Sequence, residues 1–207
     1  MSNFAEKSAP DAQNEAFLRD QLYELNEEGL EPLPEPKFLK LFRDKRTAFE
    51  IVKATNSIAV LVYLSDTDEI VLVEETRPAM STGLNPTGKS VGPVAGRFDK
   101  DVEPIDLAIM ECKEEIGANV RRDQIELLNH GAPLALCPGF TNERSYLAFA
   151  RIKSSQLDEG NAFGNADENE HCVPVRMPVL DFIKWGAVHS DIRLMLFALW
   201  VKPQIGL

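Results

Sequence analysis

The sequence predicts an α+β fold in which a mixed β-sheet is sandwiched between helices. Strand-like segments rich in β-branched and aromatic residues occur over residues 38–77 and again over residues 124–179. One helical segment, residues 103–116, lies between them, and two more close the chain, over residues 180–184 and 191–202. Strands interrupted by one helix and followed by terminal helices are typical of this class, because helices can then cover the faces of one sheet.

The N-terminal part is expected to form an arm and a proline-rich linker, residues 1–37, before a main domain over residues 38–207. Within the arm, apolar residues recur at helical spacing and predict a short amphipathic helix over residues 12–28. In the linker, three prolines fall within residues 29–38 and exclude a regular helix or a central strand there.

The main domain carries several strand signals separated by turns. The predicted strands are residues 38–44, 46–54, 57–66, 69–77, 124–136, 144–153 and 171–179. Turn-forming residues 65–68 predict a hairpin between the third and fourth of these strands. Residues 78–96 are rich in Gly and Pro and predict a loop that ends in a short strand, and residues 154–169 predict a long loop.

Composition and charge limit the classes of partner. The chain has 207 residues and a formal net charge of −11 at pH 7, so nucleic acid and anionic membrane are not expected partners. No apolar run reaches the ~18 residues of a membrane-spanning helix, and the N-terminus lacks a secretory-signal pattern, which predicts a cytoplasmic protein. The three cysteines form no C-x-x-C pair, so neither a disulfide framework nor a zinc site is expected.

The helical segment over residues 103–116 has clear ends and a clear apolar face. Pro104 suits its first turn, and Gly117 suits the position just past its end. The apolar stripe expected to face the core consists of Ile105, Ala108, Ile109, Cys112 and Ile116.

The same helix carries three glutamates close together. Glu111 and Glu115 are four residues apart and share one face, and Glu114 is three residues from Glu111, so their like charges repel. A divalent cation would turn this repulsion into attraction, because hard cations take carboxylate ligands. The alternative is a solvated acidic face, in which Lys113 softens the repulsion.

The surrounding sequence, VAGRFDKDVEPIDLAIMECKEEIGA, resembles the Nudix box, G-x5-E-x7-R-E-U-x-E-E-x-G-U, where U is a bulky apolar residue. The resemblance implies a Nudix fold. It also implies that Glu111, Glu114 and Glu115 bind metal together with the backbone carbonyl of Ala95. The lead-in to Gly96 is similar to that of the ADP-ribose pyrophosphatase branch of this superfamily.

Two box positions depart from the family pattern. Val102 stands in place of the first Glu, and Met110 stands in place of the Arg that pairs with box carboxylates in the family. These departures bear on catalytic rate more than on fold.

Three further segments resemble the same branch, in the order that the branch has them. In the first segment, VLVEETRPA, the resemblance implies that Arg77 binds a substrate phosphate. In the second, CPGFTNER, it implies that Glu143 lies near the metals or the substrate phosphates. ADENEH places Glu168 at the proposed general base, with Glu170 beside it. Each segment has an ordinary alternative: a surface arginine, a Pro-Gly turn and an acidic solvated loop.

Taken together, the resemblance implies metal-dependent hydrolysis of the pyrophosphate bond of ADP-ribose or a nucleoside diphosphate sugar. The implied cofactor is Mg²⁺, with Mn²⁺ as a substitute, and the products are a nucleoside monophosphate and a sugar phosphate. Members of the family are usually homodimers, which is the expectation here. Two alternatives stay open: a catalytically silent Nudix-fold module that binds a nucleotide, and a structural protein with an acidic helix.

Overall fold

The computed structural model describes residues 30–32, 39–81, 85, 87–99, 101–165 and 170–205. The chain divides into two compact units, residues 1–54 with 137–143 and residues 55–136 with 144–207. The helix expected over residues 12–28 lies outside the described residues, as does the expected domain boundary between residues 37 and 38.

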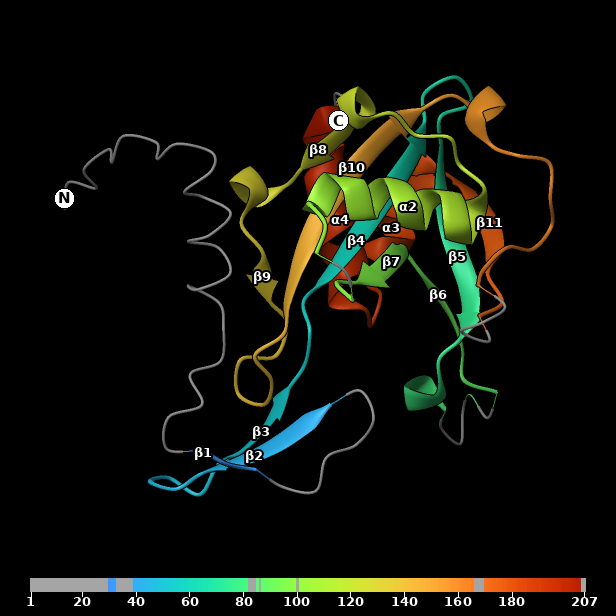
Figure 1. Ribbon diagram of the computed structural model, residues 1–207. Coiled ribbons are helices and arrows are strands. Elements are labelled where there is room, and N and C mark those ends of the chain that lie inside the picture. Colours follow the sequence, from blue (N-terminus) through green and yellow to red (C-terminus); the bar gives the residue numbers. More distant parts are fainter. Residues whose placement is uncertain are drawn as a thin grey trace, which may run out of the picture. The chain divides into compact units, whose positions relative to one another are not determined.

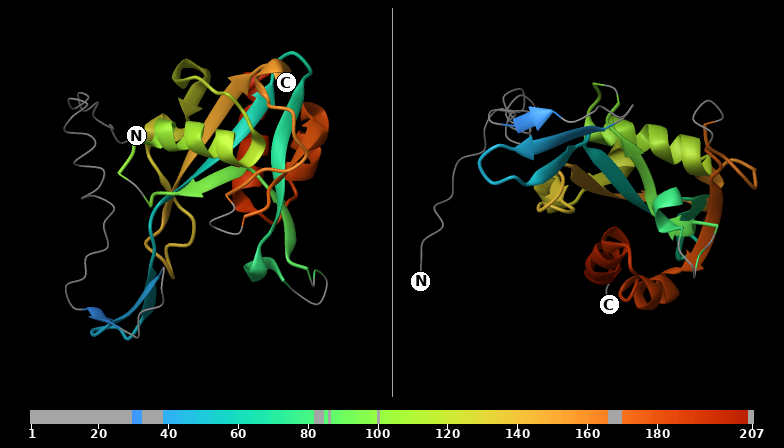
Figure 2. Two further views of the ribbon diagram at one scale, coloured as in Figure 1. Left: turned by 45° about the vertical axis from the view of Figure 1, so that its right-hand side comes forward. Right: turned by 90° about the horizontal axis from the view of Figure 1, so that it is seen from below.

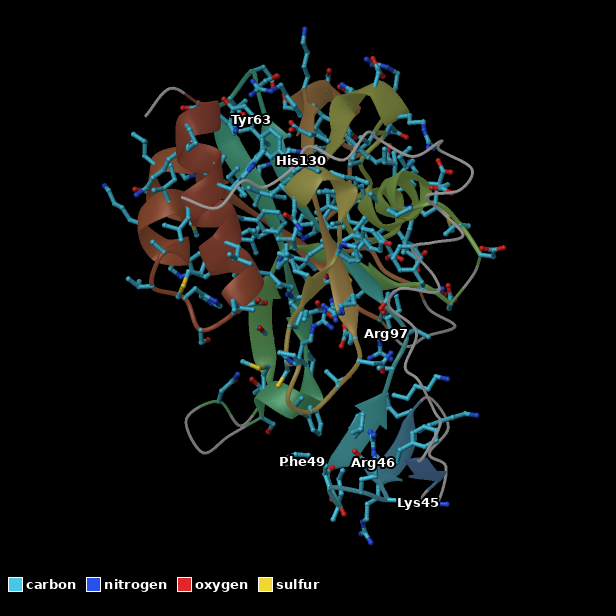
Figure 3. The ribbon with its side chains drawn as sticks, turned by 90° about the vertical axis from the view of Figure 1, so that its left-hand side faces the viewer. Lys45, Arg46, Phe49, Tyr63, Arg97 and His130 are labelled. Carbon is cyan, nitrogen blue, oxygen red and sulfur yellow. The ribbon has the colours of Figure 1, made fainter. Side chains whose placement is uncertain are left out.

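The first unit contains an antiparallel sheet in the order β1 (Leu30–Pro32), β2 (Lys40–Asp44) and β3 (Glu50–Lys53). A proline cannot donate a ladder hydrogen bond, so Pro32 suits an edge strand such as β1. Figure 3 shows Lys45, Arg46 and Phe49 at the turn that joins β2 to β3.

A second segment of the first unit, residues 137–143, is held to the end of β3. The N–H of Val52 donates to the carbonyl of Phe140 at 2.9 Å. The side-chain amide of Asn142 bonds both backbone groups of Ala54, at 2.8 and 3.2 Å. The Pro-Gly turn in this segment is therefore fixed by backbone pairing.

The second unit contains an eight-stranded mixed sheet (Figure 1). Its main path runs β11-β5-β4-β10-β8, with β6 paired to β5, β7 to β4 and β9 to β10. β10 runs parallel to β4, and the other pairs are antiparallel. Its strands are β4 (Ser57–Leu64), β5 (Glu69–Thr76), β6 (Lys89–Gly92), β7 (Val94–Arg97), β8 (Ile125–Leu127), β9 (Leu134–Ala135), β10 (Arg144–Ile152) and β11 (Val173–Pro178).

Three α-helices accompany this sheet: α2 (Pro104–Ile116), α3 (Val179–Gly186) and α4 (Ile192–Gln204). The ends predicted for the first of them are confirmed: Pro104 begins α2, and Gly117 follows it in the left-handed conformation with φ 64°. In the described part of the chain, no helix has both the length and the apolar character needed to cross a membrane.

The two faces of the sheet bury separate cores. Every residue of β4 is buried, and its side chains alternate between the faces. Ile58, Val60 and Val62 pack with α2, whereas Ala59 and Leu61 pack with α3 and α4. Figures 1 and 2 show α2 on one face and the C-terminal helices on the other. The predicted α+β class with a mixed sheet between helices is therefore confirmed.

Two predicted segments differ in detail. Residues 78–96 hold two strands, β6 and β7, rather than one. Residues 124–136 are split into β8 and β9 by a turn in which Asn129 and His130 have φ of 53° and 54°. Extended pairing cannot continue through two left-handed residues, and polar side chains such as Asn tolerate that conformation.

The start of α4 is fixed by Asp191. Its carboxylate accepts a hydrogen bond from the N–H of Arg193 at 2.8 Å and pairs with the Arg193 guanidinium at 2.7 Å. Burial alone would raise the pKa of Asp191, but the hydrogen bonds and charge of Arg193 hold it below the ordinary 3.8. The ionised carboxylate therefore stabilises the folded state.

Replacing this cap should lower stability in a pH-dependent way. Asp191→Ala is expected to lower the free energy of unfolding by about 1 kcal/mol near neutral pH. Because the pKa of Asp191 is lower in the folded chain than in the unfolded chain, its carboxylate stabilises the folded state at pH values above the ordinary pKa. This contribution is lost as the pH falls through the pKa of the folded state. The unfolding free energy of Asp191→Asn, which keeps a capping oxygen, should approach that of the unchanged chain as the pH falls below 3.8, measured by urea unfolding.

The matched control is Asp181→Ala in α3, whose carboxylate is 64% exposed. Its unfolding free energy should stay within about 0.5 kcal/mol of the parent. A loss for Asp181→Ala as large as that for Asp191→Ala would contradict the capping role.

Candidate functional site

The glutamates of α2 differ sharply in exposure. Glu115 is 3% exposed, whereas Glu111 and Glu114 are half-buried. A solvated acidic face requires exposed carboxylates, so this alternative is wrong for Glu115. The side chain of Glu115 is instead buried. Figure 1 shows α2, which carries it, lying across one face of the sheet.

Glu115 is hydrogen-bonded to β7. Its Oε2 accepts a hydrogen bond from the backbone N–H of Ala95 at 3.0 Å. In a strand, the N–H and C=O of one residue point to the same side. The carbonyl of Ala95 therefore faces the side from which the Glu115 carboxylate approaches, as the sequence resemblance expects for a backbone ligand.

Glu111 lies directly against the next residue of β7, Gly96. A Cβ added to Gly96 would be 1.9 Å from Glu111 Oε1 and 2.1 Å from its Cδ. Only glycine leaves room for the carboxylate in this position. Ala95 and Gly96 therefore bring Glu115 and Glu111 to the same part of β7.

The surroundings of Glu115 disfavour its charged form. Burial, together with the nearby carboxylates of Glu75 and Glu111, raises the pKa of Glu115 to about 9, although the Ala95 hydrogen bond and Arg77 oppose the shift. A buried carboxylate near other carboxylates needs a compensating positive charge to ionise near neutral pH. One cation among these groups would supply it.

Glu75, on β5, is a residue that the sequence reading missed. It forms an ion pair with Arg77, and its side chain is 14% exposed. Residues two apart in a strand share a face, so the strand-like pattern of residues 69–77 contained the signal that Glu75 and Arg77 lie together.

All three cysteines are free thiols. Cys137, in the first unit, is exposed, while Cys112 and Cys172 are buried. Burial raises the pKa of Cys112, and Glu115 and Glu111 raise it further. Burial, together with Glu115, Glu75 and Glu170, likewise raises the pKa of Cys172 to about 12.

Backbone hydrogen bonds join the segment that precedes β11 to α2, and others form within the segment. The N–H of Gly164 donates to the carbonyl of Glu114 at 2.9 Å. Phe163 and Cys172 exchange two backbone hydrogen bonds, and the N–H of Glu170 donates to Asn165 at 3.0 Å. Glu168 lies outside the described residues.

The structure therefore brings some of the predicted site residues together. Where α2 packs on β7, it brings together Ala95, Glu111 and Glu115. The charge of Arg77 lowers the pKa of Glu115, and the charge of Glu170 raises the pKa of Cys172.

Two other predicted residues are placed differently. Glu114 shares the helix, and its carbonyl holds Gly164. Glu143 belongs to the first unit, where its N–H donates to the hydroxyl of Thr141 at 3.1 Å.

The donor chemistry of this cluster fits a hard divalent cation. Glu111 and Glu115 supply carboxylate oxygens, and Ala95 has a carbonyl on the same side of β7. Among the described residues, no group of three or more His, Cys, Asp or Glu is arranged to hold a metal ion by itself. Mg²⁺ is commonly held by one or two carboxylates with substrate phosphates and water completing its shell, so two carboxylates suffice for such a site.

Comparison of the sequence with models of protein families gives no match, and comparison with curated proteins gives none either.

Gly96→Ala tests whether the glycine sets the position of Glu111. The contacted atoms belong to a flexible side chain, so the variant should fold while displacing the Glu111 carboxylate. Its affinity for Mn²⁺, measured by electron paramagnetic resonance, should fall by at least about tenfold, the scale seen when the support of a ligand is lost.

Gly92→Ala is the matched control, because a Cβ at Gly92 meets nothing within 4 Å. Its Mn²⁺ affinity should equal that of the unchanged chain. Equal affinities for Gly96→Ala and Gly92→Ala would show that Glu111 does not depend on this glycine.

Proposed function

We propose that this chain is a Nudix-fold pyrophosphatase. It hydrolyses the pyrophosphate bond of ADP-ribose or a nucleoside diphosphate sugar, giving a nucleoside monophosphate and a sugar phosphate. The observation that carries this proposal is the buried carboxylate of Glu115 at the contact of α2 with β7, beside Glu111. These are the two box residues that the sequence resemblance implies as core ligands.

The arrangement of elements supports the proposed fold. The segment that resembles the Nudix box forms β7, a connection and α2, in that order. The connection returns the chain so that α2 packs on the strand that precedes it. The box therefore acts as one structural element, whose strand and helix each contribute groups to the same site.

Each residue of the cluster has a defined task in the proposed reaction. Glu111 and Glu115, with the carbonyl of Ala95, would hold Mg²⁺ or Mn²⁺, with Glu114 beside them. A divalent cation in this place offsets charge on phosphoryl oxygens and lowers the pKa of a coordinated water.

Other residues would bind and orient the substrate. Arg77 presents a planar fork suited to two phosphate oxygens. The role in binding metal or phosphate that the resemblance implies for Glu143 stays a prediction. Glu168 would accept the proton of the attacking water, with Glu170 as its neighbour. The proposal also includes a cytoplasmic homodimer without nucleic-acid or membrane partners.

A second candidate function is a catalytically silent module that binds a nucleotide. The observation that favours it is Met110, which stands at the box position of the arginine and is 38% exposed. An uncharged, solvent-facing side chain there cannot pair with the glutamates of α2. A silent module would bind a nucleoside diphosphate compound without cleaving it.

A hydrolysis panel tests the proposal directly. The purified chain should release monophosphate from at least one of ADP-ribose, GDP-mannose, UDP-glucose and ADP-glucose, with Mg²⁺ or Mn²⁺ present, as measured by ion-exchange chromatography. Chelation by EDTA should abolish the reaction. Glu115→Gln should lower kcat by at least about a hundredfold, as expected for a group that stabilises developing charge.

The matched control is Glu126→Gln on β8, whose side chain is exposed. It should retain the parent rate. Binding of a substrate without any release above Glu115→Gln would favour the silent module and overturn the hydrolase proposal.

A further inference from the structure

The backbone of Arg77 is anchored at both of its polar groups. Its N–H donates to the carbonyl of Gly88 at 2.8 Å, and its carbonyl accepts from the N–H of Met80 at 2.8 Å. Gly88 has φ +67°, and a Cβ there would lie 2.7 Å from the carbonyl oxygen of Arg77. A side chain at Gly88 would therefore push against Arg77, so the glycine lets the loop close on the end of β5.

The side chain of Arg77 is anchored as well. Its Nη2 forms an ion pair with Oε1 of Glu75, which lies two residues earlier, near the end of β5. The Glu75 side chain is 14% exposed, whereas that of Arg77 is 40% exposed. The guanidinium is thus held by a largely buried carboxylate and keeps an accessible part.

The hydrogen-bond partner of Arg77 is Glu75, and that of Glu115 is a backbone group of β7. Arg77 pairs with Glu75, and Glu115 takes its hydrogen bond from the backbone of Ala95. A positive charge therefore lies close to the carboxylates of α2 without being hydrogen-bonded to Glu115. The charge of Arg77 lowers the pKa of Glu115, and the Glu115 carboxylate still has capacity to accept a ligand.

We propose that Glu75 is a positioning residue, whose ion pair with Arg77 holds the guanidinium ready to bind a diphosphate at the Glu111–Glu115 cluster. This inference rests on the proposed function. A flexible arginine loses rotamer freedom when it binds a ligand, and an ion pair formed beforehand removes part of that loss. Glu75 itself touches no substrate and acts through Arg77.

This role predicts an effect opposite in sign to simple electrostatics. Glu75→Gln removes a negative charge near the site, which by charge alone would tighten the binding of an anion. Loss of positioning instead weakens it. Glu74 on the same strand offers a matched control, because it pairs with Lys89 at 2.7 Å on the other face and has no place in the site.

The experiment measures binding of inorganic pyrophosphate with Mg²⁺ by isothermal titration calorimetry. Glu75→Gln should weaken binding by about tenfold, and Glu74→Gln should change it by less than about twofold. Arg77→Gln should bind as weakly as the double variant Glu75→Gln/Arg77→Gln, since Glu75 acts only through Arg77. The melting temperature of Glu75→Gln should not fall below that of Glu74→Gln.

With a substrate that is turned over, the loss for Glu75→Gln should appear mainly in KM, with kcat little changed. Unchanged or tighter pyrophosphate binding by Glu75→Gln overturns the inference, as does an additive loss in the double variant. Absence of pyrophosphate binding by the unchanged chain also overturns it. Binding that shows the expected pattern without any hydrolysis overturns only the proposed function.

Discussion

A nearly buried carboxylate, that of Glu115, joins α2 to β7 through the N–H of Ala95, and the geometry of the whole candidate site depends on that contact. Taking a carboxylate out of water costs several kcal/mol unless charge and hydrogen bonds compensate it. Here the nearest carboxylates, Glu75 and Glu111, increase that cost. These surroundings therefore disfavour the ionised form of Glu115 unless a positive charge compensates it.

The fold makes this arrangement possible by separating its two cores. The central strand β4 is buried on both faces, so α2 on one side and the C-terminal helices on the other can each pack independently. Gly96 then lets α2 and β7 approach each other, because it leaves room for the Glu111 carboxylate. Gly117 ends the helix in a left-handed conformation that other residues adopt at a cost. Packing thus sets where the carboxylates meet.

Much of this arrangement could be predicted from the sequence, and the missing parts have physical reasons. The ends of α2 were predictable because Pro104 and Gly117 are local signals. The buried face was predictable in the main, because Ala108, Cys112 and Ile116 are buried and Ile105 and Ile109 are partly buried against the same core. The burial of Leu107 was not predicted. Leu107 lies four residues before Glu111, so its burial carries this side of the helix inward.

The position of the Glu75–Arg77 ion pair could be predicted from the sequence only in part. A strand-like pattern predicts that the two side chains share a face, but not that the end of α2 lies close to them. That proximity arises from non-local packing of β5, β11 and α2. Glu168 was predicted from resemblance and remains a prediction, because it lies outside the described residues.

The most direct test of the central claim is the anomalous diffraction of crystals soaked in Mn²⁺. We expect a peak within coordinating distance of carboxylate oxygens from both Glu111 and Glu115, and adjacent to the carbonyl of Ala95. A peak elsewhere, or none at the cluster in crystals soaked at millimolar Mn²⁺, would contradict the claim that this buried carboxylate is there to hold a cation.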